Sequence, residues 1–195
     1  MDLLDLARQI AAALGPGWIA ERGYMIRAHV VLYGPDQQIL TITHGDDSHR
    51  HSDHGRLQIS ASYGEFSRHL GTSEGGDAIT VAAERPATAI ATDITRRLLP
   101  DYETTLERCR TRAHADALRL AERRDTIDTL CQMLAPAEIV RDDRISFGQS
   151  GDHVRGQIRV LFSGATEFEL AVTAAHTLPL ARVIAAHRRT TQDQK

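Results

Sequence analysis

Residues 101–134 read DYETTLERCRTRAHADALRLAERRDTIDTLCQML and contain neither glycine nor proline, so nothing in them breaks a helix. Its apolar residues recur every seven positions, at Leu106, Ala113, Leu120, Ile127 and Leu134. That spacing predicts one face of a long helix. The companion positions are Cys109, Asp116, Arg123 and Leu130. Because the middle of this second row is polar, we expect the helix to pack on its own chain. A homodimer through the long helix is the alternative.

The residues before this helix are expected to form an α-β-β-β-β-α module over residues 1–99. Apolar residues between Leu3 and Leu14 have helical spacing, and a glycine- and proline-rich turn follows them. Strands are predicted at residues 24–33, 38–43, 56–63 and 78–83, where β-branched and alternating residues gather. Pro86 suits the first turn of a second helix, and Pro100 ends or kinks that helix.

The residues after the long helix are expected to form a smaller β-β-β-α module over residues 136–195. Its strands are predicted near residues 145–147, 154–162 and 167–173, and its helix near residues 178–188. The expected fold class is therefore α+β. Two antiparallel-sheet modules, each closed by a helix, are joined by a long helix over residues 100–135.

Composition limits the classes of function. The chain has 195 residues, of which 42% are hydrophobic and 25% charged, so we expect a packed core. The net charge is −3, which disfavours a protein that binds polyanions over its whole surface. The first residues lack the basic segment of a signal peptide, and no apolar stretch approaches the ~20 residues of a membrane span. These features predict a cytoplasmic protein without membrane contact.

Residues 44–54 read HGDDSHRHSDH and are the best candidate for metal chemistry. The last six match H-x-H-x-D-H, the metal-binding signature of the metallo-β-lactamase fold, in which bound metal activates a water molecule. The candidate ligands are His44, His49, His51, Asp53 and His54. This pattern would make the chain a metal-dependent hydrolase.

A polar loop is the favoured interpretation of the same segment. In that fold a helix follows the motif, but the residues after His54 alternate with period two and predict a strand. Gly, Asp, Ser and His all suit a turn between two strands. A third interpretation is that the loop binds zinc or another divalent metal for structure only, since imidazole suits such metals. No other cofactor is expected.

Arginines on the predicted helices are candidates for contacts with phosphate groups of nucleic acid. The candidates are Arg112, Arg119, Arg123, Arg188 and Arg189. Acidic residues interleave with the arginines of the long helix, and the net charge is negative. A solvated helix face is therefore the favoured interpretation of this pattern.

One segment resembles proteins from other sources. Its residues are Ile79-Thr80-Val81-Ala82-Ala83, Arg85-Pro86, Ile90-Ala91, Asp93-Ile94, Arg96-Arg97-Leu98-Leu99-Pro100 and Tyr102. Over residues 55 to about 130, the chain resembles a recurring segment of uncharacterised actinobacterial proteins, often of phage or mobile-element type. The resemblance implies no activity or catalytic residue, and it does not include the H-x-H-x-D-H segment.

These observations lead to two hypotheses. The first is a non-enzymatic interaction protein of a phage or mobile element, which binds protein or nucleic acid through sheet faces and arginine-bearing helices. The second is a metal-dependent hydrolase that uses His49-Arg50-His51-Ser52-Asp53-His54.

Overall fold

The computed structural model describes residues 2–23, 29–47 and 53–190. The chain has the expected α+β class, with two antiparallel sheets and a long helix between them in sequence. It forms two compact units, unit 1 over Met1–His114 and unit 2 over Ala115–Lys195.

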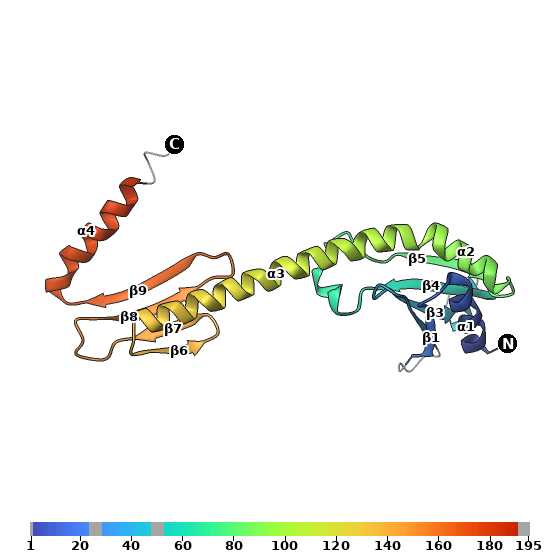
Figure 1. The fold of residues 1–195 in the computed structure, drawn as a ribbon, viewed down its shortest axis with the longest axis horizontal. Helices are drawn as coiled ribbons and strands as arrows, with labels where there is room; N and C mark the ends of the chain where they lie inside the picture. The colour runs from blue at the N-terminus through green and yellow to red at the C-terminus, as the bar shows by residue number, and fades with distance from the viewer. Residues whose placement is uncertain (1, 24–28, 48–52, 191–195) are drawn as a thin grey trace. The chain divides into compact units, whose positions relative to one another are not determined.

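Unit 1 contains a five-stranded antiparallel sheet in the order β1-β2-β3-β4-β5. The strands are β1 (Ile19–Arg22), β2 (His29–Tyr33), β3 (Ile39–His44), β4 (Arg56–Ser62) and β5 (Ala78–Ala82). Its helices are α1 (Leu3–Leu14) and α2 (Ala87–Arg97), which lie against each other (Figure 1). Short 3-10 turns cover Gly45–Asp47 and Gly64–His69.

The core of unit 1 lies between one face of this sheet and its helices. Alternate residues of β2 to β5 are buried, such as Leu32, Leu40 and Ile59. Helices α1 and α2 bury their own apolar faces in the same cluster. The helices therefore cover the apolar face of the five-stranded sheet, as a layered α+β unit requires.

The sequence predicted four strands for this part of the chain, and the structure has a fifth, β1. Its four residues, Ile-Ala-Glu-Arg, include two charged side chains and are mostly exposed. Such a short edge strand has no alternating apolar pattern that would reveal it. The other predicted strands are confirmed within a few residues over the described part of the chain. Residues 24–28, in the first predicted strand, lie outside it.

Helix α3 (Leu99–Met133) confirms the long helix, and Pro100 lies in its first turn. Leu106 belongs to the core of unit 1, whereas Ile127 and Leu134 belong to the core of unit 2 or pack against it. Three of the five heptad positions are thus used within the chain. Ala113 and Leu120 are the two heptad positions that belong to neither core. The homodimer through this helix stays a prediction.

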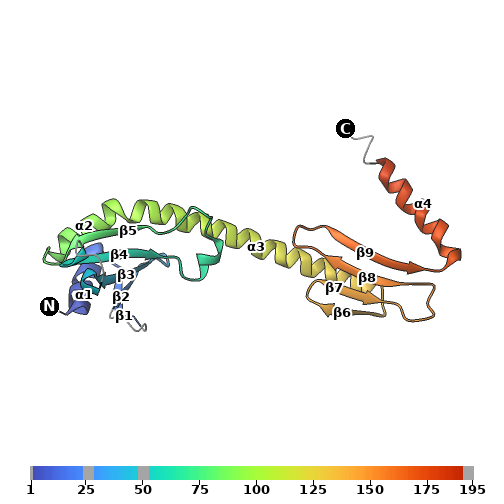
Figure 2. The ribbon, with the colours of Figure 1, turned by 180° about the vertical axis from the view of Figure 1, so that it is seen from behind.

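Unit 2 contains a four-stranded antiparallel sheet in the order β6-β7-β8-β9. The strands are β6 (Ala137–Arg141), β7 (Arg144–Phe147), β8 (Val154–Val160) and β9 (Thr166–Val172). In Figures 1 and 2, the C-terminal part of α3 lies along β7 and β8 and β9 forms one edge. Helix α4 (Ala174–Thr190) follows β9.

Two features of unit 2 differ from the sequence-based expectation. Strand β6 was not predicted, because Ala-Glu-Ile-Val-Arg lacks clean alternation and is almost wholly exposed. Helix α4 begins at Ala174 rather than near Leu178, so Pro179 lies inside the helix instead of near its start.

Candidate interaction surface of unit 2

One row of apolar side chains crosses all four strands of unit 2. Ile139 pairs with Ile145, Ile145 with Ile158, and Ile158 with Phe168. Direct partners on antiparallel strands point to the same face of the sheet. The two central residues are fully buried, whereas Ile139 is 54% exposed and Phe168 is 57% exposed. The sheet face that packs on α3 is therefore covered in the middle and open at both edges.

The edges of this sheet face stay open because a single helix is narrower than four strands. Side chains of α3, such as Ile127 and Leu130, pack over Ile145 and Ile158. A helix is about 10 Å across, whereas four strands spaced about 4.8 Å apart span roughly 14 Å between the outer strands. Among the described residues, the buried apolar cluster of unit 2 has four members, against 21 in unit 1. One helix is too narrow to complete the core of unit 2.

The open strip at the β9 edge has a simple sequence origin. Alternation along β9 places Phe168, Leu170 and Val172 on the same face, one after another. Leu170 and Val172 are half-buried, and Phe168 is mostly exposed. We call these three side chains the β9 strip. A contiguous exposed apolar patch of this kind marks interaction sites more often than scattered single residues do.

Helix α4 carries a second uncovered apolar surface. Leu180, Val183 and Ile184 lie at i, i+3 and i+4, so they share one side of the helix. We call these three side chains the α4 stripe. Val183 and Ile184 are each more than half exposed, and Leu180 is half-buried. Every other residue of α4 with a described side chain is exposed.

The junction between β9 and α4 is a single residue, Thr173, with several contacts. Its N–H donates to the backbone oxygen of His153 (3.0 Å), and its own carbonyl accepts from the N–H of His176 (2.9 Å). The hydroxyl of Thr173 lies 3.0 Å from Nδ1 of His176. The rings of His153 and His176 stack with centroids 5.1 Å apart. The first turn of α4 is thus fastened to the ends of β8 and β9.

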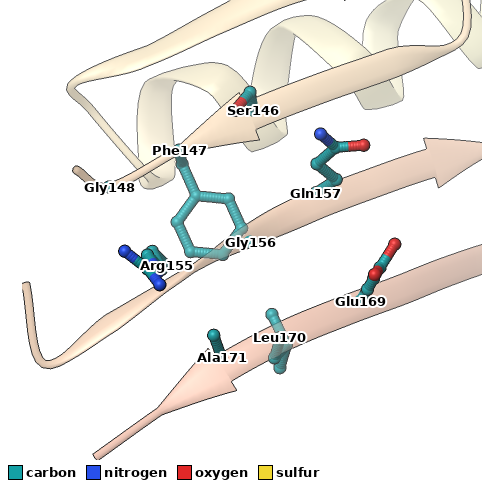
Figure 3. A pocket seen from close by; sticks show the side chains of 9 residues that line it. All are labelled: Ser146, Phe147, Gly148, Arg155, Gly156, Gln157, Glu169, Leu170 and Ala171. Carbon is teal, nitrogen blue, oxygen red and sulfur yellow. The ribbon is translucent and has the colours of Figure 1, made fainter. Parts of the chain in front are cut away.

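The opposite face of the sheet is polar. Ser146, Gln157 and Glu169 are direct partners across β7, β8 and β9 (Figure 3). They line an open hollow of about 310 Å³ together with Arg155 and neighbouring residues. On the same face, Arg159 is hydrogen-bonded to Asp143 (2.9 Å), which holds the pKa of that carboxyl below its usual range. This face is a charge-balanced, solvated surface.

The His/Asp segment is only partly described. His49 and His51 lie outside the described residues, so the predicted ligand set stays a prediction. His44 ends β3, and its Nδ1 is buried with no hydrogen-bond partner among the described atoms. Asp53 and His54 lie in the turn before β4. The residues after His54 thus form the strand that the sequence predicted, and not the helix that follows this motif in the metallo-β-lactamase fold. In the described ranges, no three His, Cys, Asp or Glu residues come together as metal ligands.

Two of the five candidate arginines make hydrogen bonds within their own units. Arg112 is hydrogen-bonded to the Glu74 carboxylate and to the backbone oxygen of His69 (2.9 Å). Arg123 donates through Nε to the backbone oxygen of Val160 (2.9 Å). Both are therefore used to hold α3 to its own unit.

The remaining candidate arginines have weaker structural roles or lie beyond what is described. Arg119 is exposed and lies 3.2 Å from Asp116 in an i, i+3 pair, which contributes little stability at a surface. The side chains of Arg188 and Arg189 fall outside the described part of the chain. The predicted nucleic-acid contacts of these arginines therefore stay a prediction.

No protein family, curated protein or solved structure matches this chain. Among the helices that the structure describes, none combines the length and the apolar character of a membrane span.

Proposed function

We propose that this chain is a non-enzymatic interaction protein of a phage or mobile element, and that unit 2 binds a protein partner through the sheet face that carries the β9 strip. The observation that supports this proposal is the row that ends in Phe168. Its central members are buried under α3, whereas its end is open. Full burial of a Phe side chain is worth about 1.5–3 kcal/mol, so a partner that covers it gains substantially.

The distribution of exposed apolar residues supports the same proposal. In the described part of the chain, only Ile19 and Tyr33 of unit 1 are large exposed hydrophobic residues. In unit 2 the corresponding residues are Leu118, Leu120, Met133, Ile139, Val140, Val154, Phe162, Phe168, Leu178, Val183 and Ile184. A unit with so small a core and so much exposed apolar surface is of the kind that a protein partner completes.

A protein partner is favoured over nucleic acid on electrostatic grounds. The net charge of −3 opposes general binding to phosphate backbones. Arg112 and Arg123 already pair within the chain. The uncovered surface is apolar rather than basic, which suits a protein side-chain contact.

Site-specific photo-cross-linking in the native host tests this proposal. A photoreactive phenylalanine analogue at position 168 is expected to form adducts with a partner protein, because that side chain is the most exposed member of the β9 strip. The matched control carries the analogue at position 169, which points to the polar face of the same strand. Adducts from position 168 alone would support the proposal. No protein adduct, or equal adducts from both positions, would contradict it.

A further inference from the structure

We propose that the β9 strip of unit 2 is covered by helix α4 of a second copy of this chain, in a reciprocal two-fold dimer. The inference rests on the proposed function, because it names the partner for the same sheet face. Each copy would supply one helix and receive one.

The two surfaces match in kind, because both are short rows of large apolar side chains. The β9 strip contains Phe168, Leu170 and Val172, and the α4 stripe contains Leu180, Val183 and Ile184. Both belong to unit 2, and each has members that are more than half exposed, namely Phe168 in the β9 strip and Val183 and Ile184 in the α4 stripe. Docking α4 beside α3 would give the four-stranded sheet two helices. Unit 1 covers one face of its sheet with more than one helix in the same way.

The chain connection disfavours docking of α4 on its own sheet. Thr173 is the only residue between β9 and α4. Connections between strands and helices that pack on each other usually need about 2–6 residues to reverse direction. Unit 1 uses four residues, 83–86, between β5 and α2, and α2 does join the core. A short junction that prevents closure within one chain favours exchange between two chains.

The contacts at the junction reinforce this argument. Unwinding the first turn of α4 would lengthen the connection, but it would break the hydrogen bonds between Thr173 and His176. It would also separate the stacked rings of His153 and His176. The junction therefore keeps α4 as a helix that starts directly after β9. Its apolar stripe remains available to a second copy.

Charge complementarity points the same way. The sequence of α4 contains Arg182, Arg188 and Arg189 and no acidic residue. The unit 2 part of α3, residues 115–133, contains four acidic residues against three arginines. One of those arginines, Arg123, already lies 3.9 Å from Asp143. A basic helix that docks beside α3 on the sheet would meet a surface of opposite net charge.

The interface would reach the lower size limit of a specific contact. Helix α4 has 17 residues. At 1.5 Å per residue it is about 25 Å long, with a contact footprint roughly 10 Å wide. Counted on both surfaces and in both reciprocal contacts, the buried area is on the order of 1,000 Å², near the lower limit for a specific interface. The two-fold arrangement is closed, so it would not extend into a filament.

Sedimentation equilibrium of the full chain gives the first test. We expect a dimer of twice the 21.5 kDa chain mass. The variants Phe168→Asp and Ile184→Asp should each be monomeric and should keep the helix content of the wild type, because both side chains are more than half exposed in one chain. The matched control is Leu120→Asp on α3, which is similarly exposed and would disrupt a dimer through the long helix instead. It should remain dimeric.

Mixing the two monomeric variants gives the decisive test. The Phe168→Asp chain keeps an intact α4, and the Ile184→Asp chain keeps an intact β9 strip. Their mixture should form a heterodimer through one intact contact, with at least a tenfold tighter association than either variant shows alone. If the Leu120→Asp chain is monomeric, or if the mixture of the Phe168→Asp and Ile184→Asp chains stays monomeric, the proposed contact is overturned.

Sedimentation of the wild-type chain and cross-linking from position 168 together distinguish failure of the dimer from failure of the proposed function. A wild-type monomer whose position 168 still cross-links to another protein contradicts the dimer but leaves the interaction protein standing. A monomer without any cross-link from position 168 contradicts both.

Discussion

Ile158 and Phe168 are direct partners across β8 and β9, yet Ile158 is fully buried and Phe168 is 57% exposed. Their side chains point to the same face of the sheet, so the difference comes from α3, which covers one and not the other. This relationship separates the part of the face that is buried in the core of unit 2 from the part that α3 leaves exposed.

Substitution of these two partners should have different effects on the isolated chain. Ile158→Ala removes buried methyl groups and leaves a cavity, so it should lower the free energy of unfolding of unit 2 by about 2–4 kcal/mol. Phe168→Ala, measured at a concentration where the chain is monomeric, should change it by less than about 1 kcal/mol. Urea denaturation followed by circular dichroism measures both. Equal losses from the two substitutions would contradict the assignment of Phe168 as an uncovered residue.

Glu74 should give the stability of unit 1 a distinct pH dependence. The Arg112 guanidinium and the Gly71 N–H hydrogen-bond to its carboxylate and hold its pKa at about 2, below the ordinary value of 4.5. Because the folded pKa is depressed, the stabilisation is fully present above pH 4.5. It declines as the pH falls toward 2.

The variant Glu74→Gln tests that dependence. It should lower the Tm at neutral pH, and the difference from wild type should shrink as the solution is acidified through this window. Glu65→Gln, which changes an exposed glutamate in the nearby 3-10 turn, serves as the control and should leave the Tm unchanged at every pH. A constant difference between Glu74→Gln and wild type at all pH values would show that the ion pair is not the cause.

Tyr102 should hold two strands of unit 1 in register with α3. Its hydroxyl accepts from the N–H of Ile39 (2.8 Å) and donates to the carbonyl of Ser62 (2.8 Å). Tyr102→Phe leaves both groups without this partner and should cost about 1–3 kcal/mol. Burial also raises the pKa of Tyr102, so ultraviolet titration should find it ionising above an ordinary tyrosine. Tyr33→Phe, on an exposed position, should cost far less.

Cys109 should be an unreactive thiol in the folded protein. It is fully buried in the core of unit 1, and burial raises its pKa, with a further contribution from the charge of Glu74. Because the thiolate is the nucleophile, a disulfide reagent should modify Cys109 only after unfolding. The rate is measured in a Cys131→Ser chain so that a single thiol reports. Modification as fast in native buffer as in denaturant would contradict this placement.

The regular elements were predictable because their periodicity is local. Helix α3 was expected over residues 101–134 and runs from Leu99 to Met133. The strands with alternating residues, such as β4 and β8, were also expected at their positions. The edge strands β1 and β6 were missed, because they are short and carry charged residues without clean alternation.

The candidate surface was not predictable for a different reason. The pattern Thr-Glu-Phe-Glu-Leu-Ala-Val indicates that Phe168 and Leu170 share a face of β9. It cannot indicate whether a helix covers that face, which depends on the width of α3 and on the one-residue junction before α4. The histidine-rich segment was singled out by its H-x-H-x-D-H pattern, but His49 and His51 lie outside the described residues.

Hydrogen–deuterium exchange of α4 as a function of protein concentration shows whether this helix docks on a second copy of the chain. If α4 docks on the β9 strip of a second copy, its amides over residues 174–187 should exchange more slowly as the concentration rises. The Ile184→Asp chain should lose that dependence. Exchange rates in α4 that are the same at every concentration, and the same in both chains, would contradict docking of α4 on a second copy.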